Sequence, residues 1–236
     1  MTVVLMLGSA PNAIEAREYP RAGFDQILAI NNAYAIRPDW DATIYPYDFD
    51  PARIPVPTAE QRLIDERDFV PAQNRYGGFI YAGATMAFTA AYWALDHYRP
   101  SVIAVLGCDM TYAKQGPTHF YGTGTPDPLR ADISLRDLSA KSARLQIMAA
   151  QQGCAMVNLS RLPSRLVFPR CDLAAMPQIT PLPFDATLAA NALAAEVACG
   201  YLTPTGHYAH IDVDTVKLDA IDALWLGALE LSPNAA

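Results

Sequence analysis

The residues best suited to chemistry lie together in the stretch "GCDMTYAKQGPTHFYG", residues 107–122. An imidazole changes charge near neutral pH, so His119 is a candidate general base or acid. A loop histidine that is merely exposed to solvent is the alternative. The neighbouring Tyr112 and Tyr121 favour a partly buried pocket wall over that alternative. Asp109, directly after an apolar run, is a candidate for orienting a ribose or an acceptor.

Two further polar groups follow short apolar runs. In "GSAPN", Gly8 lets the backbone turn closely, and the N–H groups that follow could face a phosphate. Ser9 and Asn12 would then contact that ligand, or would simply cap a helix. Asn31 and Asn32 each offer amide donors and an acceptor to a base or a sugar, with a helix cap or a turn as the alternative.

Charged side chains at strand ends allow two other kinds of contact. Asp48 and Asp109 could hold a divalent cation on a pyrophosphate or bind ribose hydroxyls, and structural turns are the alternative. Arg161, Arg165 and Arg170 could clamp phosphates or a carboxylate, or could form a solvated basic surface.

These residues need strands and helices to position them, and the sequence predicts an alternation of the two. Apolar runs typical of buried strands alternate with helical patterns up to residue 160. The predicted strands are 2–8, 26–32, 41–48, 101–107 and 154–160, and the predicted helices are 9–19, 81–98 and 134–153. This alternation predicts a doubly wound, mostly parallel α/β sheet of the Rossmann-like type. The polar groups would then gather at one edge of the sheet, beyond the carboxyl ends of the strands.

The rest of the chain is less regular. Residues 51–78 are rich in proline and charge and predict a loop with a short helix at 58–68. Helical stretches follow at 186–202 and 213–231. They would pack on the sheet or form an oligomer interface. The sequence thus predicts a nucleotide-binding α/β domain over 1–168 and a helical C-terminal extension over 169–236.

Composition narrows the classes of function. The chain has 236 residues, is 52% hydrophobic and has a net charge of −7, which argues against nucleic acid and anionic membranes as partners. Its four cysteines are widely and irregularly spaced, and the loop histidines His207 and His210 do not favour a metal site. The N-terminus resembles neither a signal peptide nor a membrane span, so we expect a cytoplasmic protein without a transmembrane segment. Glycine motifs for dinucleotides or phosphate loops, serine-hydrolase elbows and zinc-protease motifs are absent from the sequence.

The order of the motifs resembles a known family. The motifs are "LGSAPN", "LAINNAY", "YAGATMA", "IAVLGCDMTY" and "VNLSRLPSRL", and they span roughly residues 2–168. This order is similar to that of the bacterial sialyltransferases of glycosyltransferase family 42. It is also similar to the related domain of motility-accessory glycosyltransferases and of the archaeal 6-hydroxymethylpterin pyrophosphokinase. The resemblance implies a glycosyltransferase-A variant of the Rossmann-like fold.

The resemblance also implies roles for particular positions. In such enzymes the first Gly-rich turn and the Asn-bearing strand end hold the nucleotide, the turn before the central helix contacts the donor, and tyrosines after the "G-x-D" strand approach the phosphate. The corresponding positions here are Gly8, Ser9, Asn31, Asn32, Gly83, Thr85, Tyr112 and Tyr121.

The sequence also departs from this family. The sialyltransferases carry a general-base histidine just before the next helix, where this chain reads "RADISLRD". Their first turn commonly reads G-x-G-P-S, whereas this chain has Ala10 and Asn12. Asp48 stands where they carry an asparagine and is closer to the pyrophosphokinase.

Three functions are therefore expected from the sequence. The first is a glycosyltransferase that moves a sugar from a nucleotide-activated donor, such as a CMP-sugar, to a carbohydrate acceptor, with His119 as base. The second is a pyrophosphokinase-like enzyme that uses ATP and Mg²⁺, with Asp48 and Asp109 on the metal. The third is a binding module that has kept the fold without the chemistry.

Overall fold

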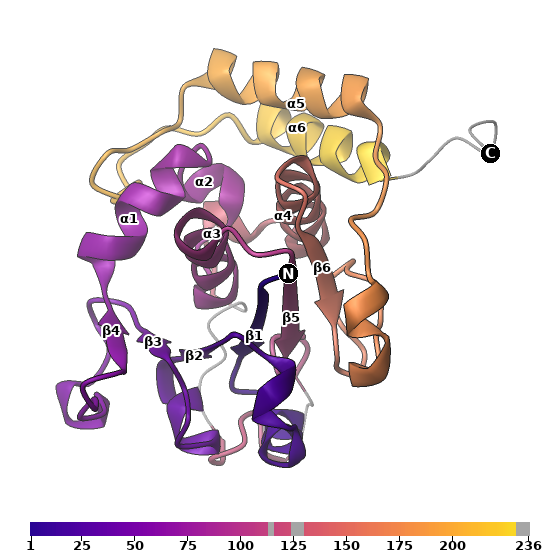
Figure 1. The fold of residues 1–236 in the computed structure, drawn as a ribbon. Helices are drawn as coiled ribbons and strands as arrows, with labels where there is room; N and C mark the ends of the chain where they lie inside the picture. The colour runs from indigo at the N-terminus through magenta and orange to yellow at the C-terminus, as the bar shows by residue number, and fades with distance from the viewer. Residues whose placement is uncertain (113–115, 124–129, 230–236) are drawn as a thin grey trace.

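The computed structural model describes residues 1–112, 116–123 and 130–229. Its centre is a sheet of six strands, all parallel, in the order β4-β3-β2-β1-β5-β6 (Figure 1). The strands are β1 (Val3–Leu7), β2 (Gln26–Ile30), β3 (Ala42–Ile44), β4 (Arg62–Ile64), β5 (Val102–Leu106) and β6 (Ala155–Asn158). The predicted doubly wound α/β fold is confirmed.

The central strands are apolar along their whole length because both faces of the sheet are covered. All five residues of β5 are buried, and β1 pairs with it from Val3↔Val102 to Leu7↔Leu106. On its other side β1 pairs with β2. The sheet grows from β1 to β4 in one direction and from β5 to β6 in the other. The strand order therefore switches between β1 and β5.

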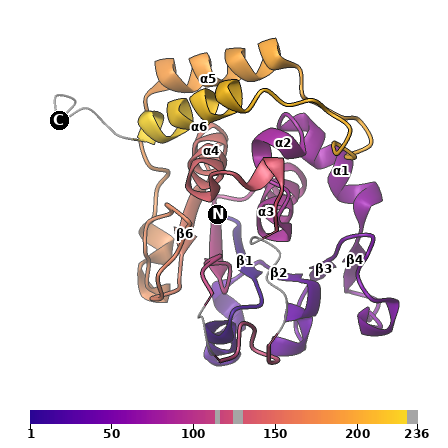
Figure 2. The same ribbon diagram turned by 180° about the vertical axis from the view of Figure 1, so that it is seen from behind.

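Helices cover the sheet on both faces (Figures 1 and 2). The α-helices are α1 (Glu66–Arg75), α2 (Phe79–Ala82), α3 (Met86–Tyr98), α4 (Leu138–Gln151), α5 (Ala186–Cys199) and α6 (Thr215–Leu229). The first four share one hydrophobic core with one face of the sheet. Short 3₁₀-helices cover the other face: η1 (Pro11–Glu18), η3 (Asn31–Ile36) and η7 (Leu173–Gln178). Other 3₁₀-helices in the described residues are η2 (Arg21–Gly23), η4 (Pro51–Arg53) and η6 (Ile133–Leu135).

The segment predicted as a loop with a short helix at 58–68 contains β4 within that predicted helix, and its helix, α1, lies further along the chain. β4 pairs with β3 at the edge of the sheet, and α1 begins after Asp65, whose carboxylate accepts from Arg67 N at 2.9 Å. Three strand residues are too few to produce an alternating pattern, so the prolines and charges around them dominated the prediction. The predicted helix 81–98 is in fact two helices, because Gly83 has a φ of +84° and interrupts it.

Two predictions about strand ends are corrected. β3 ends at Ile44 rather than reaching Asp48, which lies exposed in a turn. Pro46 has no N–H to give to a ladder, and its carbonyl accepts from Phe49 N at 3.0 Å to close that turn. Ser9 and Asn12 do not cap a helix, because the cap of η1 is Ala10 without a side-chain hydrogen bond.

The C-terminal helices are joined to the sheet domain through α4. α5 and α6 lie side by side as an outer layer, and α6 packs on α4 (Figures 1 and 2). Lys141 of α4 is completely buried and lies 2.7 Å from Asp222 of α6. Arg144 of α4 is also buried and holds Glu196 of α5 through two hydrogen bonds of 2.7 and 2.8 Å. Buried charges thus fix the position of this layer.

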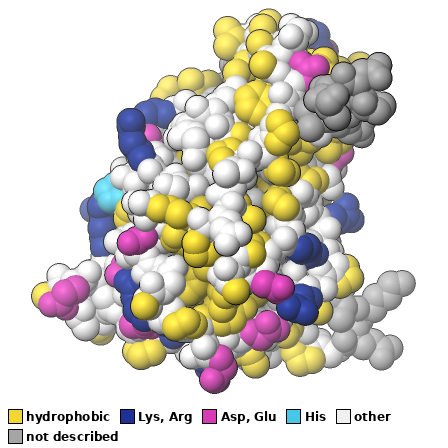
Figure 3. All heavy atoms as spheres, turned by 45° about the vertical axis from the view of Figure 1, so that its right-hand side comes forward, with side chains coloured by type: hydrophobic (Ala, Val, Ile, Leu, Met, Phe, Trp, Pro, Cys, Tyr) yellow, Lys and Arg dark blue, Asp and Glu magenta, His cyan; other side chains and the backbone are white. Residues whose placement is uncertain are grey.

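The surface is mixed in charge. On the face drawn in Figure 3, acidic and basic side chains are interspersed around broad hydrophobic areas. Over the described part of the chain, no helix is both long enough and apolar enough to cross a membrane.

Candidate functional site at the strand switch point

A cavity of about 180 Å³ lies at the carboxyl ends of β1, β2 and β5. Ligands of open parallel sheets bind where the strand order switches, and β1 and β5 form that switch here. The predicted residues that line the cavity are Gly8, Ser9, Asn31, Thr85, Tyr112, His119 and Tyr121. Residues far apart in the sequence therefore meet at one site, as the strand-end pattern predicted.

Two glycines make the floor of the cavity possible. A Cβ on Gly8 would lie 2.3 Å from the carbonyl oxygen of Gly107, so only glycine allows the turns after β1 and β5 to cross this closely. Gly107 has a φ of +76°, and a Cβ there would lie 2.6 Å from that of Ala13. The turns are joined by a hydrogen bond from Gly8 N to Leu106 O at 2.8 Å.

The N-terminus of α3 forms one wall. Thr85 caps the helix by accepting from Phe88 N at 3.2 Å. Met86 and Ala87 follow, and both line the cavity. The N–H groups of a helix's first turn have no intrahelical carbonyl and carry the positive end of the helix dipole. This wall can therefore bind an anion. Gly83 lies just before it and does not line the cavity.

The turn that leads into α3 is held by the C-terminal extension. Ala84 N donates to Ser134 Oγ at 3.1 Å, and Ser134 Oγ donates to Asp132 at 2.7 Å. Tyr208, from the extension, donates to the other oxygen of Asp132 at 2.7 Å. Although burial opposes the shift, the hydrogen bonds from Ser134 and Tyr208 hold the pKa of Asp132 below its ordinary value. The extension thus supports the cavity wall from outside.

Asn31 combines an unusual backbone with an unused acceptor. Its φ is +53°, in the left-handed region that asparagine tolerates better than most residues. Its side-chain oxygen is buried and has no hydrogen-bond partner among the described residues. Because this oxygen has almost no accessible surface, it can meet a ligand donor only if the amide turns toward the cavity that Asn31 lines. Asn32 is 8% exposed and does not line the cavity.

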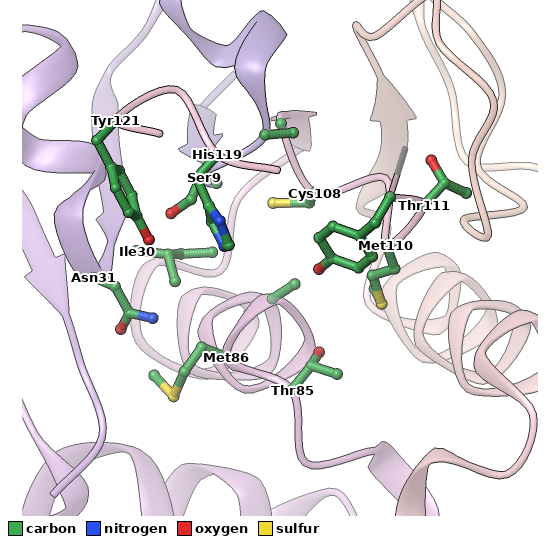
Figure 4. Close-up of a pocket in the computed structure, with 15 residues that line it drawn as sticks. Ser9, Ile30, Asn31, Thr85, Met86, Cys108, Met110, Thr111, His119 and Tyr121 are labelled. Carbon is green, nitrogen blue, oxygen red and sulfur yellow. The ribbon is translucent and has the colours of Figure 1, made fainter. Parts of the chain in front are cut away.

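His119 faces the α3 wall from the other side of the cavity (Figure 4). Its Nδ1 lies 2.8 Å from Thr118 Oγ1, and its ring stacks on Tyr121 with centroids 5.0 Å apart. The ring of Tyr112 is 6.3 Å away. Burial, and then the positive charge of Arg53, lower the pKa of His119 below its ordinary value of 6.5. The imidazole is therefore neutral at physiological pH and can accept a proton.

The histidine segment is attached to the sheet. Phe120 N donates to Ser9 O at 2.9 Å, which links it to the turn after β1. His119 N and Gly122 N exchange hydrogen bonds with each other's carbonyl oxygens at 2.9 and 3.1 Å. These backbone contacts hold the imidazole over the β1 turn. Lys114, in the same sequence stretch, lies outside the described residues.

Asp109 does not reach the cavity, although Cys108 and Met110 on either side of it do. Its side chain is buried and turned toward β6, where it accepts from Asn158 Nδ2 at 3.1 Å. The guanidinium of Arg170 lies 3.7 Å from the same carboxylate oxygen. In this structure Asp109 organises the loop after β6.

Two of the three predicted arginines have other partners. Arg161 forms an exposed ion pair with Asp172 at 2.6 Å, and Arg170 donates to the carbonyls of Ser160 and Leu162. Neither Arg161, Arg165 nor Arg170 lines the cavity. Asn12 lies near them, since its Nδ2 donates to Ser160 Oγ at 2.9 Å.

The described residues do not fit a magnesium site at this cavity. Mg²⁺ is usually held by carboxylates, and none of the described lining residues is acidic. Asp48 is exposed and Asp109 faces β6, so neither lines the cavity. Within the described ranges, no group of three or more His, Cys, Asp or Glu residues could hold a metal ion.

The sequence prediction missed the apolar wall of the cavity. Ile30, Met86, Cys108 and Met110 line it (Figure 4). In the sequence these residues continue strand and helix patterns and are indistinguishable from core. Burial raises the pKa of the Cys108 thiol well above its ordinary value, so it behaves as a small apolar side chain. The flat face of an aromatic ring, such as that of a nucleobase, can pack against this wall.

We compared the chain with known proteins in three ways. A scan against protein-family models, a search of curated proteins and a search of solved structures each found no match. The fold and the cavity thus define a doubly wound α/β protein with a site at its strand switch point.

Proposed function

We propose that the protein is a nucleotide-dependent transferase, specifically a glycosyltransferase that uses a CMP-activated sugar and a carbohydrate acceptor. One observation carries this proposal: the start of α3 and a neutral imidazole face each other across a cavity at the switch point. The first can bind a phosphate and the second can take a proton. The motif order described above supports CMP as the nucleotide.

In this proposal the nucleotide lies along the strand ends. Its phosphate accepts from the N–H groups of Met86 and Ala87, and the apolar wall packs against the base. The side-chain amide of Asn31, which lines the cavity, forms a hydrogen bond with the base or the ribose. Gly8 and Ser9 complete the floor.

The chemical step follows from the position of His119. An acceptor hydroxyl loses its proton to Nε2 while its oxygen forms a bond to the anomeric carbon of the donor sugar. The bond from that carbon to the phosphate oxygen breaks, and its electron pair leaves on CMP. Hydrogen bonds from Tyr112 and Tyr121 stabilise the charge that develops on the phosphate. The step needs no metal ion.

The pyrophosphokinase alternative is not favoured by any feature of the cavity. Transfer of a pyrophosphate from ATP depends on Mg²⁺ held near the phosphates. The described lining of this cavity offers the ion no carboxylate.

The transferase proposal is tested by the release of CMP from CMP-activated sugars with a panel of carbohydrate acceptors. We expect His119→Ala to reduce acceptor-dependent release by about 10²–10⁴-fold, as for loss of a general base. His210→Ala, in an exposed loop, is the matched control and should release CMP at the wild-type rate. Wild-type activity in His119→Ala would remove the proposed base.

A further inference from the structure

Arg53 does not line the cavity, but it contacts a residue that does. The guanidinium carbon of Arg53 is 5.4 Å from the ring centroid of Tyr121, which lines the cavity. It is also 5.9 Å from the ring of Phe49. The residue is exposed, and its positive charge contributes to the lowered pKa of His119. Arg53 thus lies beside the Tyr121 wall of the cavity, exposed to solvent and near enough to His119 to affect its pKa.

The loop after β3 fixes this position through local contacts. Asp50 caps η4 by accepting from Ala52 N at 2.9 Å. The hydroxyl of Tyr34 donates to the carbonyl of Arg53 at 2.7 Å. The backbone of Arg53 is therefore anchored, while its side chain extends toward Tyr121.

The side chain has no acidic partner among the described residues. Arg62 and Arg75, by contrast, form ion pairs of 2.5 Å with Asp68 and Asp96. Stacking on aromatic rings occupies the faces of the guanidinium and leaves the N–H groups at its edge for an anion. The described lining of the cavity holds no carboxylate that would compete for them.

We propose that Arg53 binds the phosphate of the nucleotide in the cavity. This inference rests on the proposed function and names a specificity-determining residue for it. The phosphate lies between two donors: the N–H groups at the start of α3 on one side and the guanidinium of Arg53 on the other. Figure 4 shows Met86, at the start of α3, and Tyr121, the ring that Arg53 contacts. Bidentate, charge-assisted hydrogen bonds from arginine distinguish a nucleotide from its nucleoside.

The test is calorimetric titration of CMP and of cytidine into the wild type and its variants. We expect Arg53→Gln to weaken CMP binding by about tenfold or more and to leave cytidine within twofold, because only CMP carries the phosphate. Arg53→Lys should recover part of the loss, because lysine keeps the positive charge but lacks the planar guanidinium that can donate two parallel hydrogen bonds. CMP affinity should also fall less steeply with salt in Arg53→Gln than in the wild type.

Arg99→Gln is the matched control. Arg99 is exposed at the C-terminal end of α3, about 20 Å along the helix from the cavity wall at 1.5 Å per residue. Removing its charge should leave CMP binding unchanged. Equal loss of CMP and cytidine binding in Arg53→Gln, or no loss beyond that of Arg99→Gln, would overturn the inference alone. Failure of the wild type to bind CMP would overturn the proposed function together with the inference.

Discussion

At the scale of single residues, the site depends on the protonation state of His119. Burial and the nearby charge of Arg53 lower its pKa, so the protonated form gains population only at pH values below the ordinary 6.5. A base must be neutral to accept a proton.

We therefore expect kcat/KM for sugar transfer to stay constant as pH falls from neutrality and to decline only below about 6.5. In Arg53→Gln one cause of the lowered pKa is absent, so this decline should move to higher pH. The measurement is a pH–rate profile of both proteins at constant ionic strength. A decline that begins well above 6.5 in the wild type would contradict the assignment of His119.

The sequence predicted which residues lie near the cavity better than it predicted where their side chains point. His119, Tyr112 and Tyr121 line the cavity, and so do other described residues of the same stretch after β5, among them Cys108 and Met110. Asp109 belongs to the same segment but turns toward Asn158, a partner 49 positions away. No local pattern reveals such a partner. Arg53 was missed for the same reason, because its contact with Tyr121 joins two distant loops.

At the scale of elements, the crossing of the turns after β1 and β5 determines the shape of the cavity floor. An alanine at position 8 would push its Cβ against the backbone of Gly107, which cannot rotate away. Gly23, at the end of η2, offers the contrast, since a Cβ there meets nothing within 4 Å.

We expect Gly8→Ala to lower the free energy of unfolding by about 1–3 kcal/mol, as for other overpacked sites, and to weaken nucleotide binding. Gly23→Ala should change neither quantity. Urea unfolding and CMP titration of both variants measure the two effects. The account of the floor is wrong if Gly8→Ala matches Gly23→Ala in both.

The boundaries of helices and strands could be predicted from the sequence only where a single hydrophobic pattern ran through the whole element. The buried runs of β1 and β5 were found to within a residue or two, because fully buried parallel strands are continuously apolar. β4 and the break at Gly83 depend on pairing and packing, and both were missed. Since α3 begins only after that break, its N-terminal wall could not be placed from the helical pattern alone.

At the scale of the whole molecule, buried ion pairs join the C-terminal helices to α4. Lys141 and Asp222 are 0% and 3% exposed, and Glu196 also accepts from the indole of Trp225 at 2.8 Å. In the sequence these charges look like part of a solvated helix face. Their burial could not be predicted because it requires the covering layer of α5 and α6.

We expect Lys141→Met to lower the free energy of unfolding by about 3–5 kcal/mol, because it leaves the buried Asp222 carboxylate unpaired. The double variant Lys141→Met with Asp222→Leu should recover most of that loss, since it removes both charges. Removing the exposed pair Arg136–Asp219, which also joins the extension to the sheet domain, is the control and should have no measurable effect. Equal losses in the single and double Lys141 variants in urea unfolding would contradict this account.

The proposed function requires the cavity to bind a nucleoside monophosphate without a metal ion. It is tested most directly by the thermal unfolding of the wild-type protein with millimolar CMP in the presence of EDTA. A ligand that binds only the folded state raises the unfolding temperature, and the rise grows with the logarithm of the ligand concentration once that exceeds Kd. We expect the unfolding temperature to rise with the concentration of CMP, and we expect Mg²⁺ not to increase that rise. No rise with CMP, or a rise seen only with ATP and Mg²⁺, would contradict the proposed function.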